Sequence, residues 1–282
     1  MSARRPVLPS AARPPLALAA LALGAQVLPA GTWLPAVRRT LFPALAGLGN
    51  RGHVALTFDD GPDPRSTPLF LDVLEGMSAH ATFFVLGESL VRYPETGREI
   101  VRRGHELAVH GWTHSRPWFS SFARDTRELA WAAEAVRGTA GAAPVWYRPP
   151  YGILTAGRWA AALRTGLRPV LWSAWGRDWT ADATGASVLA TVRRDLRGGG
   201  TVLLHDTDRV AAPGCWRATL EALPVLVGGL RDAGLTVGPL AGHGIGTRRA
   251  GRRTPSRTCG GFRRSAAGPG PAEGSSPSGW TG

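Results

Sequence analysis

The sequence predicts an α/β fold in which parallel strands alternate with helices and close into a small barrel. From about residue 52 onward, short apolar, β-branched or aromatic runs alternate with segments of helical periodicity. About seven strand–helix units fit in roughly 190 residues, which suits one helix-covered sheet better than two domains. A doubly wound open sheet is the alternative that the hydrophobic pattern leaves open.

The expected strands are short and follow one another at similar intervals. They cover residues 53–58, 81–86, 106–109, 145–148, 169–174, 201–204 and 235–237. The expected helices cover residues 67–77, 125–136, 159–163, 186–196 and 220–230. The first helix illustrates the pattern, because Phe70, Leu74 and Met77 recur at the spacing of one helical face.

The net charge of +13 is concentrated at the two ends of the chain. Residues 1–45 carry five arginines and no acidic residue, and residues 245–282 carry seven arginines and one glutamate. The region between them has a net charge of about +2. A nucleic-acid-binding domain would carry its positive charge on the folded surface, so this distribution argues against one.

The N-terminal segment, residues 1–45, is expected to be a signal peptide or a membrane anchor. Three arginines precede an apolar run over residues 16–28, which has the length of a signal-peptide hydrophobic region. The stretch from Arg13 to Arg38 contains no other charge and is long enough for an uncleaved anchor. A packed N-terminal helix is the alternative. We therefore expect an exported protein that is extracellular, in the cell envelope or membrane-anchored.

The C-terminal segment, residues 243–282, is expected to be a disordered tail. It is rich in glycine, proline, serine and arginine and has almost nothing to bury. The folded domain is then residues 46–242. Cys215 and Cys259 have no C-x-x-C spacing, so neither a disulfide framework nor a cysteine zinc site is indicated.

Polar side chains gather at the C-terminal ends of the expected strands. The residues with chemical potential at these ends are Asp59, Asp60, His110, His114, Arg148, Asp178 and His205. In a parallel β/α barrel the C-terminal strand ends open on one face, where ligands bind. We therefore expect these side chains to converge in one cleft.

Each motif has a simpler interpretation when it is taken alone. DDGP is typical of a turn, RPPYG of an extended loop, and the spacing in HGWTH occurs by chance among surface histidines. GRDW is compatible with a core tryptophan, and LLHD with a strand end. Their common position at strand ends favours one site over five coincidences.

The chemistry available to this set is specific. Two neutral histidines and one carboxylate form a three-ligand site for a divalent metal, with positions left for water and substrate. A second carboxylate can act as general base and a histidine as general acid. A cation would also offset the repulsion between Asp59 and Asp60. Hydrolysis of an amide or ester is the expected reaction.

The motifs TFDDGP, HGWTH, RPPYG, WGRDW and LLHD, in this order, resemble those of the polysaccharide deacetylase family. This is the NodB-homology group, carbohydrate esterase family 4, and the resemblance covers roughly residues 52–240. It implies a distorted, seven-stranded (β/α) barrel and hydrolysis of the linear amide in N-acetylated sugars. It also implies a divalent metal, zinc, with cobalt or nickel as alternatives.

The resemblance also implies roles for individual residues. Asp60, His110 and His114 resemble the metal ligands. Asp59 resembles the base that takes a proton from the attacking water, and Arg148 resembles the residue that orients this base.

On the substrate side, His205 resembles the acid that protonates the leaving amine. The backbone N–H of Tyr151 corresponds to an oxyanion donor, and Trp179 and Leu203 correspond to walls of a pocket for the acetyl methyl group.

The sequence departs from the family pattern at two positions. Gly111 stands where a serine or threonine usually follows the first histidine, so a loop-bracing hydroxyl is lost. Trp175 stands where an aspartate usually lies three residues before Asp178. Asp178 is therefore expected to serve either His205 or Arg148, and the sequence leaves this choice open. Several tryptophans near the strand ends are candidates to stack on sugar rings, namely Trp112, Trp118, Trp146, Trp172 and Trp175.

The predicted function is metal-dependent removal of acetyl groups from N-acetylglucosamine-containing polysaccharide, either peptidoglycan or a chitin-like polymer. We expect a monomer with no nucleic-acid partner. The alternatives are an O-acetyl esterase acting on xylan or another wall polymer, and a catalytically inactive carbohydrate-binding module. Nucleic-acid binding by the basic ends is a third rival, which predicts affinity that falls steeply with salt.

Overall fold

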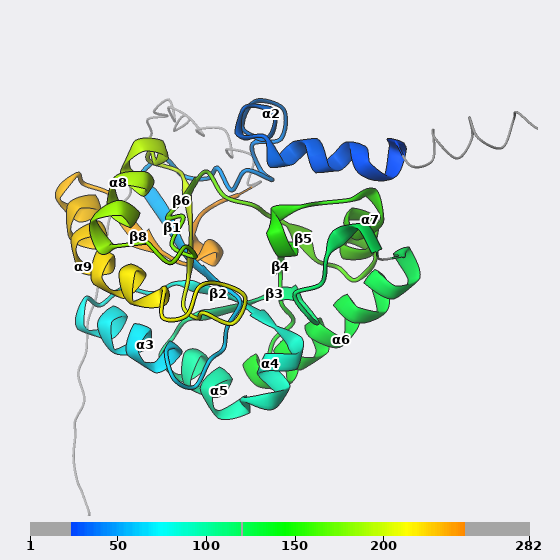
Figure 1. Ribbon diagram of the computed structural model, residues 1–282, viewed down its shortest axis with the longest axis horizontal. Helices are drawn as coiled ribbons and strands as arrows, with labels where there is room; N and C mark the ends of the chain where they lie inside the picture. The colour runs from blue at the N-terminus through cyan, green and yellow to red at the C-terminus, as the bar shows by residue number, and fades with distance from the viewer. Residues whose placement is uncertain (1–23, 120, 246–282) are drawn as a thin grey trace, which may run out of the picture. The chain divides into compact units, whose positions relative to one another are not determined.

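The structure, a computed structural model, describes residues 24–119 and 121–245, which form a curled parallel sheet with helices around it (Figure 1). The strands are β1 (His53–Asp59), β2 (Thr82–Leu86), β3 (Glu106–Gly111), β4 (Trp146–Tyr147), β5 (Arg168–Pro169), β6 (Ala174–Trp175), β7 (Thr201–His205) and β8 (Thr236–Gly238). The α-helices are α2 (Pro35–Leu41), α3 (Thr67–Gly76), α4 (Gly87–Arg92), α5 (Pro94–Arg102), α6 (Phe122–Ala140), α7 (Ala156–Arg164), α8 (Gly185–Asp195) and α9 (Trp216–Asp232). Short 3₁₀ helices are η1 (Leu28–Trp33), η2 (Pro117–Phe119), η3 (Pro150–Gly152) and η4 (Leu240–Gly242).

The sheet is parallel and runs in the order β5-β4-β3-β2-β1-β7-β6, with β8 paired to the beginning of β1. The strand expected over residues 169–174 is divided into two. β5 pairs with β4 at one edge, and β6 pairs with β7 at the other. The Val170 amide still donates to the Tyr147 carbonyl of β4 at 2.9 Å, and the next amide, that of Leu171, leaves the sheet and donates to the Leu45 carbonyl at 2.7 Å.

One continuous segment therefore joins the two edges of the sheet. The sheet curls around on itself, and this confirms the predicted distorted (β/α) barrel over the doubly wound alternative.

Side chains along β1 alternate between two apolar clusters. Val54, Leu56 and Phe58 belong to the large cluster that packs the sheet against the helices. Ala55 belongs to a smaller cluster drawn from several strands and the C-terminal turn: Ala55, Phe84, Ala108, Trp146, Val170, Leu240 and Ile245. Because both faces of the strand are buried, β1 reads as a nearly continuous apolar run.

Two helices between β2 and β3 were not predicted. α5 begins with Pro94, which suits the first turn because the N–H it lacks has no helical partner there. Its outer side carries arginine–glutamate pairs, and Ile100 is its buried apolar side chain. With so few apolar side chains, α5 lacks the repeated apolar residues from which the other helices were predicted.

The segment predicted as a leader is described from residue 24 onward, and its later part lies against the barrel. Arg38 is 3% exposed and donates from Nε to the Trp172 carbonyl at 2.9 Å. Among the residues that the structure describes, no helix combines the length and hydropathy required to cross a bilayer. Export and anchoring stay predictions.

The predicted tail lies outside the described residues apart from residues 243–245. His243 is fully buried and Ile245 belongs to the inner cluster, so the folded part reaches slightly beyond the expected boundary.

Candidate active site

The two adjacent aspartates lie at the C-terminal end of β1, and both are buried. Asp59 pairs in register with His205 of β7, which sets base and acid candidates on neighbouring strand ends. Asp60 adopts a positive φ of 77°. Successive strand residues point to opposite faces, and this left-handed turn instead lets both aspartates line the same cleft. Gly61 continues the turn against the Asp206 carboxylate, where a Cβ would lie 2.8 Å from both oxygens.

Asp60, His110 and His114 form a three-residue cluster able to hold a metal ion. Nε2 of His110 lies 3.1 Å from Asp60 Oδ1, and Nε2 of His114 lies 3.5 Å from the same oxygen. One ligand atom from each residue falls within 4.8 Å of the others. His110 comes from β3 and His114 from the loop that follows it.

The protonation states of this cluster suit a cation. Burial lowers the pKa of His114 to about 4, so its ring is neutral near pH 7 and keeps a lone pair for a ligand bond. Burial alone would raise the pKa of Asp60, but contacts with His110, His205 and His114 outweigh it and lower that pKa, so Asp60 is a carboxylate. Two imidazole nitrogens and one carboxylate are a donor set that zinc and similar divalent ions accept.

The loop that carries His114 is held by a buried arginine. Nη2 of Arg158 donates to the Ser115 carbonyl at 3.0 Å and to its hydroxyl at 3.2 Å. Arg158 is 2% exposed and lies in the first turn of α7 beside Asp125, with its Nε 3.7 Å from Asp125 Oδ1. Gly111, at φ +116°, lacks the hydroxyl that the family pattern has there, and the Arg158 contacts brace the same loop.

Arg148 lies completely buried behind Asp59. Its Nη1 donates to Asp59 Oδ1 at 2.6 Å and to the Thr57 hydroxyl at 2.8 Å, and Nη2 donates to the Leu171 carbonyl at 2.9 Å. The guanidinium also stacks over the ring of Phe84, 4.0 Å from its centroid. A main-chain carbonyl and a hydroxyl thus accompany Asp59 in holding Arg148.

Asp178 contacts His205, one of the two partners that the sequence left open. Its Oδ1 is 2.9 Å from His205 Nδ1, and its Oδ2 accepts from the His205 backbone amide at 2.7 Å and from the Thr219 hydroxyl. Burial lowers the pKa of His205, but Asp178 and then Asp60 outweigh it and raise this pKa to about 10. The imidazole therefore carries a proton near neutral pH.

Asp59, Asp60, His110, His114 and His205 line one cleft of about 560 Å³, whereas Arg148 and Asp178, which were expected there too, are buried behind it. Tyr151, Trp179 and Leu203 line it as the sequence predicted, and Trp172 and Trp175 line it too. Tyr151 has a positive φ of 62° and its ring contacts that of His114, with centroids 4.4 Å apart. The lining residues that the sequence did not suggest are Trp33, Gly152, Ile153, Arg177, Val210 and Ala211.

Asp206 follows His205 in the chain but does not line the cleft. It is 1% exposed and accepts from the Thr67 hydroxyl beneath the Asp60–Gly61 turn. Burial raises the pKa of its carboxyl to about 7. Its contacts are those of a brace under the turn.

A parallel barrel with a His/Asp metal cluster and an ion-paired histidine at its strand ends belongs to the class of metal-dependent hydrolases. Comparison with known proteins is more specific. A family model described as polysaccharide deacetylase matches residues 47–170.

A chitooligosaccharide deacetylase of Bradyrhizobium sp. (strain ANU 289) is 39% identical over 197 residues, which are 66% of this chain and 88% of that protein. A peptidoglycan-N-acetylglucosamine deacetylase of Bacillus cereus is 31% identical over 208 residues, 72% of this chain and 73% of the relative. The crystal structure of a peptidoglycan N-acetylglucosamine deacetylase superposes with a TM-score of 0.66 at 28% identity, covering 71% of this chain and 92% of the other. The chain belongs to the polysaccharide deacetylase family, and it is a deacetylase of the hydrolase class.

Proposed function

We propose that the protein removes acetyl groups from N-acetylated sugar residues of a polysaccharide, peptidoglycan or chitin-like. The observation that carries the proposal is the convergence, in one cleft, of a buried carboxylate pair, two histidines and an ion-paired third histidine. The relatives named above act on chitooligosaccharide and on N-acetylglucosamine in peptidoglycan, and both substrates carry the N-acetyl group.

Asp59 is proposed as the general base. Arg148, which also donates to the Thr57 hydroxyl, donates to Oδ1 of the base, so the carboxylate stays oriented when it accepts a proton from water. Asp60, His110 and His114 would hold a divalent cation, with zinc the proposed ion. Such an ion supplies Lewis acidity toward water and the acetyl carbonyl.

His205 is proposed as the general acid. Its Nε2 lies 3.8 Å from Asp60 Oδ2, so the ring faces the same centre from the neighbouring strand β7. Asp178 fixes the ring through Nδ1 and stabilises the protonated form, which leaves the proton on Nε2 available to the leaving group.

This acid favours an amide over an ester substrate. In amide hydrolysis the amine leaves the tetrahedral adduct only after its nitrogen is protonated. In ester hydrolysis the alkoxide is a better leaving group and depends less on a general acid. Leu203 and Trp179 line the cleft beside His205, where an acetyl methyl group would avoid water. Tyr151 is proposed to bind the substrate at the loop after β4 through its backbone N–H.

We also infer that the protein acts outside the cytoplasm as a monomer. The apolar N-terminal run that follows three arginines supports export. The activity of a relative on peptidoglycan supports a location of this protein in the cell envelope.

The test is acetate and free-amine release by the metal-loaded full chain from N-acetylated chitooligosaccharides, peptidoglycan and acetylxylan. We expect equal acetate and amine from an N-acetylated glycan, loss of activity after chelation, and recovery with zinc. Acetate release from acetylxylan alone, without amine, would identify an O-acetyl esterase instead.

Asp59→Asn provides the second arm. The variant keeps the metal cluster, so it should bind the ion as the wild type does while kcat falls by about 10³-fold or more. Asp232→Asn, an exposed change at the end of α9, is the control and should retain full activity. Persistent activity in Asp59→Asn would contradict the assigned base, and no activity on any acetylated glycan would indicate a binding module.

A further inference from the structure

A row of indole rings extends one wall of the cleft away from the proposed acid. Trp179 lies beside His205, with ring centroids 5.8 Å apart, and Trp175 lies 5.1 Å from Trp179. Trp33 completes the row, with its centroid 6.2 Å from that of Trp175 and its plane turned by 76°. All these rings line the same cleft, although Trp33 comes from the segment before the barrel.

The ring at the end of the row is the one most open to solvent. Trp33 keeps 42% of its surface exposed, whereas Trp172, stacked behind Trp175 at 5.7 Å, is only 4% exposed. Trp172 therefore packs behind Trp175 and supports it. The indole surface that a ligand can reach lies on Trp175 and Trp33.

Trp33 is held in place by buried polar contacts. The Arg38 guanidinium lies over the Trp172 ring at 5.1 Å, and its Nη1 donates to the main-chain carbonyl of Trp33. Arg39 donates to the carbonyl of Ser173 in the segment that closes the barrel. In Figure 1 this N-terminal segment, in dark blue, lies beside the β5–β6 region. Arg38 is 3% exposed, and because a buried charge is costly unless it is hydrogen-bonded, its bond to the carbonyl indicates a fixed backbone position for Trp33.

We propose that Trp33 and Trp175 form a subsite that stacks on a pyranose ring next to the sugar being deacetylated. Indole faces pack well against the apolar C–H faces of a sugar ring, and the row continues directly from the acid toward the next ring along a glycan. The partly or fully exposed charges near this pair are of both signs, with Arg177 5.9 Å from Trp175 and with Arg39 and Asp195 lining a small cavity beside Trp33, which suits a neutral glycan. The subsite selects oligomers over single sugars, and this inference rests on the proposed deacetylase function.

The test compares Trp33→Ala and Trp33→Phe with the wild type on N-acetylglucosamine oligomers of increasing length. For Trp33→Ala we expect kcat/KM on the longer oligomers to fall by about 3- to 10-fold, mainly through KM, with little change on the shortest substrate. Trp33→Phe keeps an aromatic face and should lose less. Trp131→Ala removes an indole that is 50% exposed on α6, outside the cleft, and should behave as wild type. An equal loss at every length, or none, would overturn the subsite.

A binding arm separates this proposal from the proposed function. The chelator-treated full chain is titrated with the N-acetylglucosamine tetramer, and affinity is measured by calorimetry. Weaker binding by Trp33→Ala than by the wild type supports the subsite even if no acetate is released. Absence of tetramer binding by the wild type, or equal affinities for both proteins, overturns it.

Discussion

The carboxylate of Asp178 contacts His205 twice, through the ring nitrogen Nδ1 at 2.9 Å and through the backbone amide at 2.7 Å. One carboxylate thus fixes both the ring and the strand end that carries it. It also supplies the main attraction that raises the pKa of His205 to about 10.

Asp178→Asn should therefore impair the acid rather than the metal site. Loss of the negative charge lowers the pKa of His205, so the protonated form is lost at lower pH and the basic limb of kcat/KM moves to lower pH. We expect kcat to fall by about 10²-fold. The measurement is a pH–rate profile on an N-acetylated oligomer at saturating metal.

Thr219→Val is the matched control for this change. It removes a hydroxyl donor from the same carboxylate but keeps the charge, so the basic limb should shift much less. A basic limb that is unchanged in Asp178→Asn would show that His205 is not the titrating acid.

Gly61→Ala should destabilise the turn that carries Asp60. The added Cβ would lie 2.8 Å from both Asp206 oxygens, closer than side chains tolerate, so the turn or Asp206 must move. We expect the free energy of unfolding to fall by about 1–3 kcal/mol in urea denaturation, together with weaker metal binding.

Gly138→Ala serves as the comparison, since its Cβ would meet nothing within 4 Å on helix α6. That change should stabilise the protein by up to about 1 kcal/mol through helix propensity. Equal effects of the two alanines would contradict the close approach at Gly61.

Arg158→Met should weaken metal affinity without altering a ligand. The side chain braces the loop after His114 through two contacts to Ser115, and supporting contacts of this kind are worth roughly 10- to 100-fold in affinity. We expect a loss of about 10-fold in zinc affinity, measured by competition with a chelating dye.

Arg164→Met changes an exposed arginine at the end of the same helix and should leave zinc affinity unchanged. Arg158→Lys should restore part of the loss, because it keeps the charge and one donor. Wild-type affinity in Arg158→Met would mean that the loop does not need this brace.

The location of the site was predictable because it depends on topology. Parallel strands bring their C-terminal ends to one face whatever the side-chain packing, so Asp59, His110 and His205 were expected together, and they lie in one cleft. DDGP is typical of a turn, and the positive φ of Asp60 provides one at the end of β1.

Other features depend on tertiary contacts that no sequence pattern indicates. The carbonyl of Leu171 binds Arg148, but every residue has a carbonyl, so the partner was not predictable. The division of the 169–174 strand depends on how far the sheet curls. Trp33 lies in an apolar segment typical of a leader, and only packing through Arg38 places it in the cleft.

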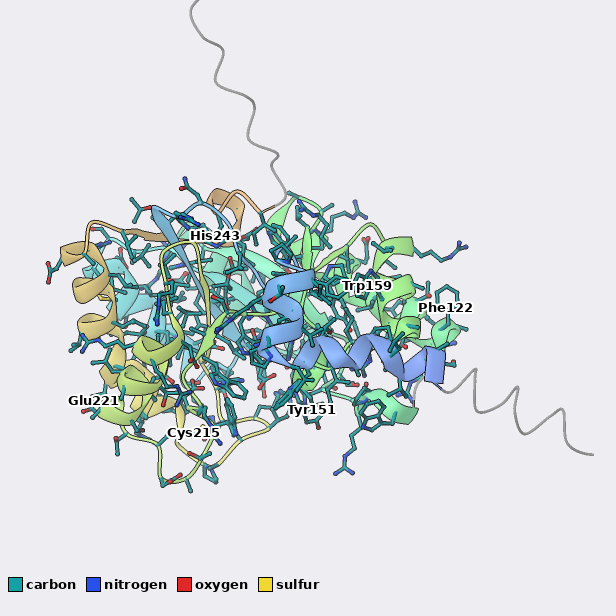
Figure 2. The ribbon with its side chains drawn as sticks, turned by 90° about the horizontal axis from the view of Figure 1, so that it is seen from above. Phe122, Tyr151, Trp159, Cys215, Glu221 and His243 are labelled. Carbon is teal, nitrogen blue, oxygen red and sulfur yellow. The ribbon has the colours of Figure 1, made fainter. Side chains whose placement is uncertain are left out.

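Acid should destabilise the protein through a histidine pair remote from the cleft. His53 Nδ1 lies 2.8 Å from His243 Nδ1, and His243 Nε2 lies 3.0 and 3.1 Å from the carbonyls of Gly47 and Gly199. Those carbonyls require a proton on Nε2, so Nδ1 of His243 must accept from His53. Figure 2 shows His243 on the opposite side of the domain from Tyr151 of the cleft.

Burial lowers the pKa of His243 to about 4, below the value of 6.5 expected in the unfolded chain. Between these values the unfolded chain binds the extra proton, so stability present above pH 6.5 is lost as the pH falls toward 4, by up to about 3 kcal/mol. His243→Gln should be less stable at neutral pH but should flatten this part of the pH dependence, as measured by urea unfolding from pH 7 to pH 4. His80→Gln, at an exposed position, should keep most of the wild-type slope, and an unchanged slope in His243→Gln would exclude His243 as a contributor.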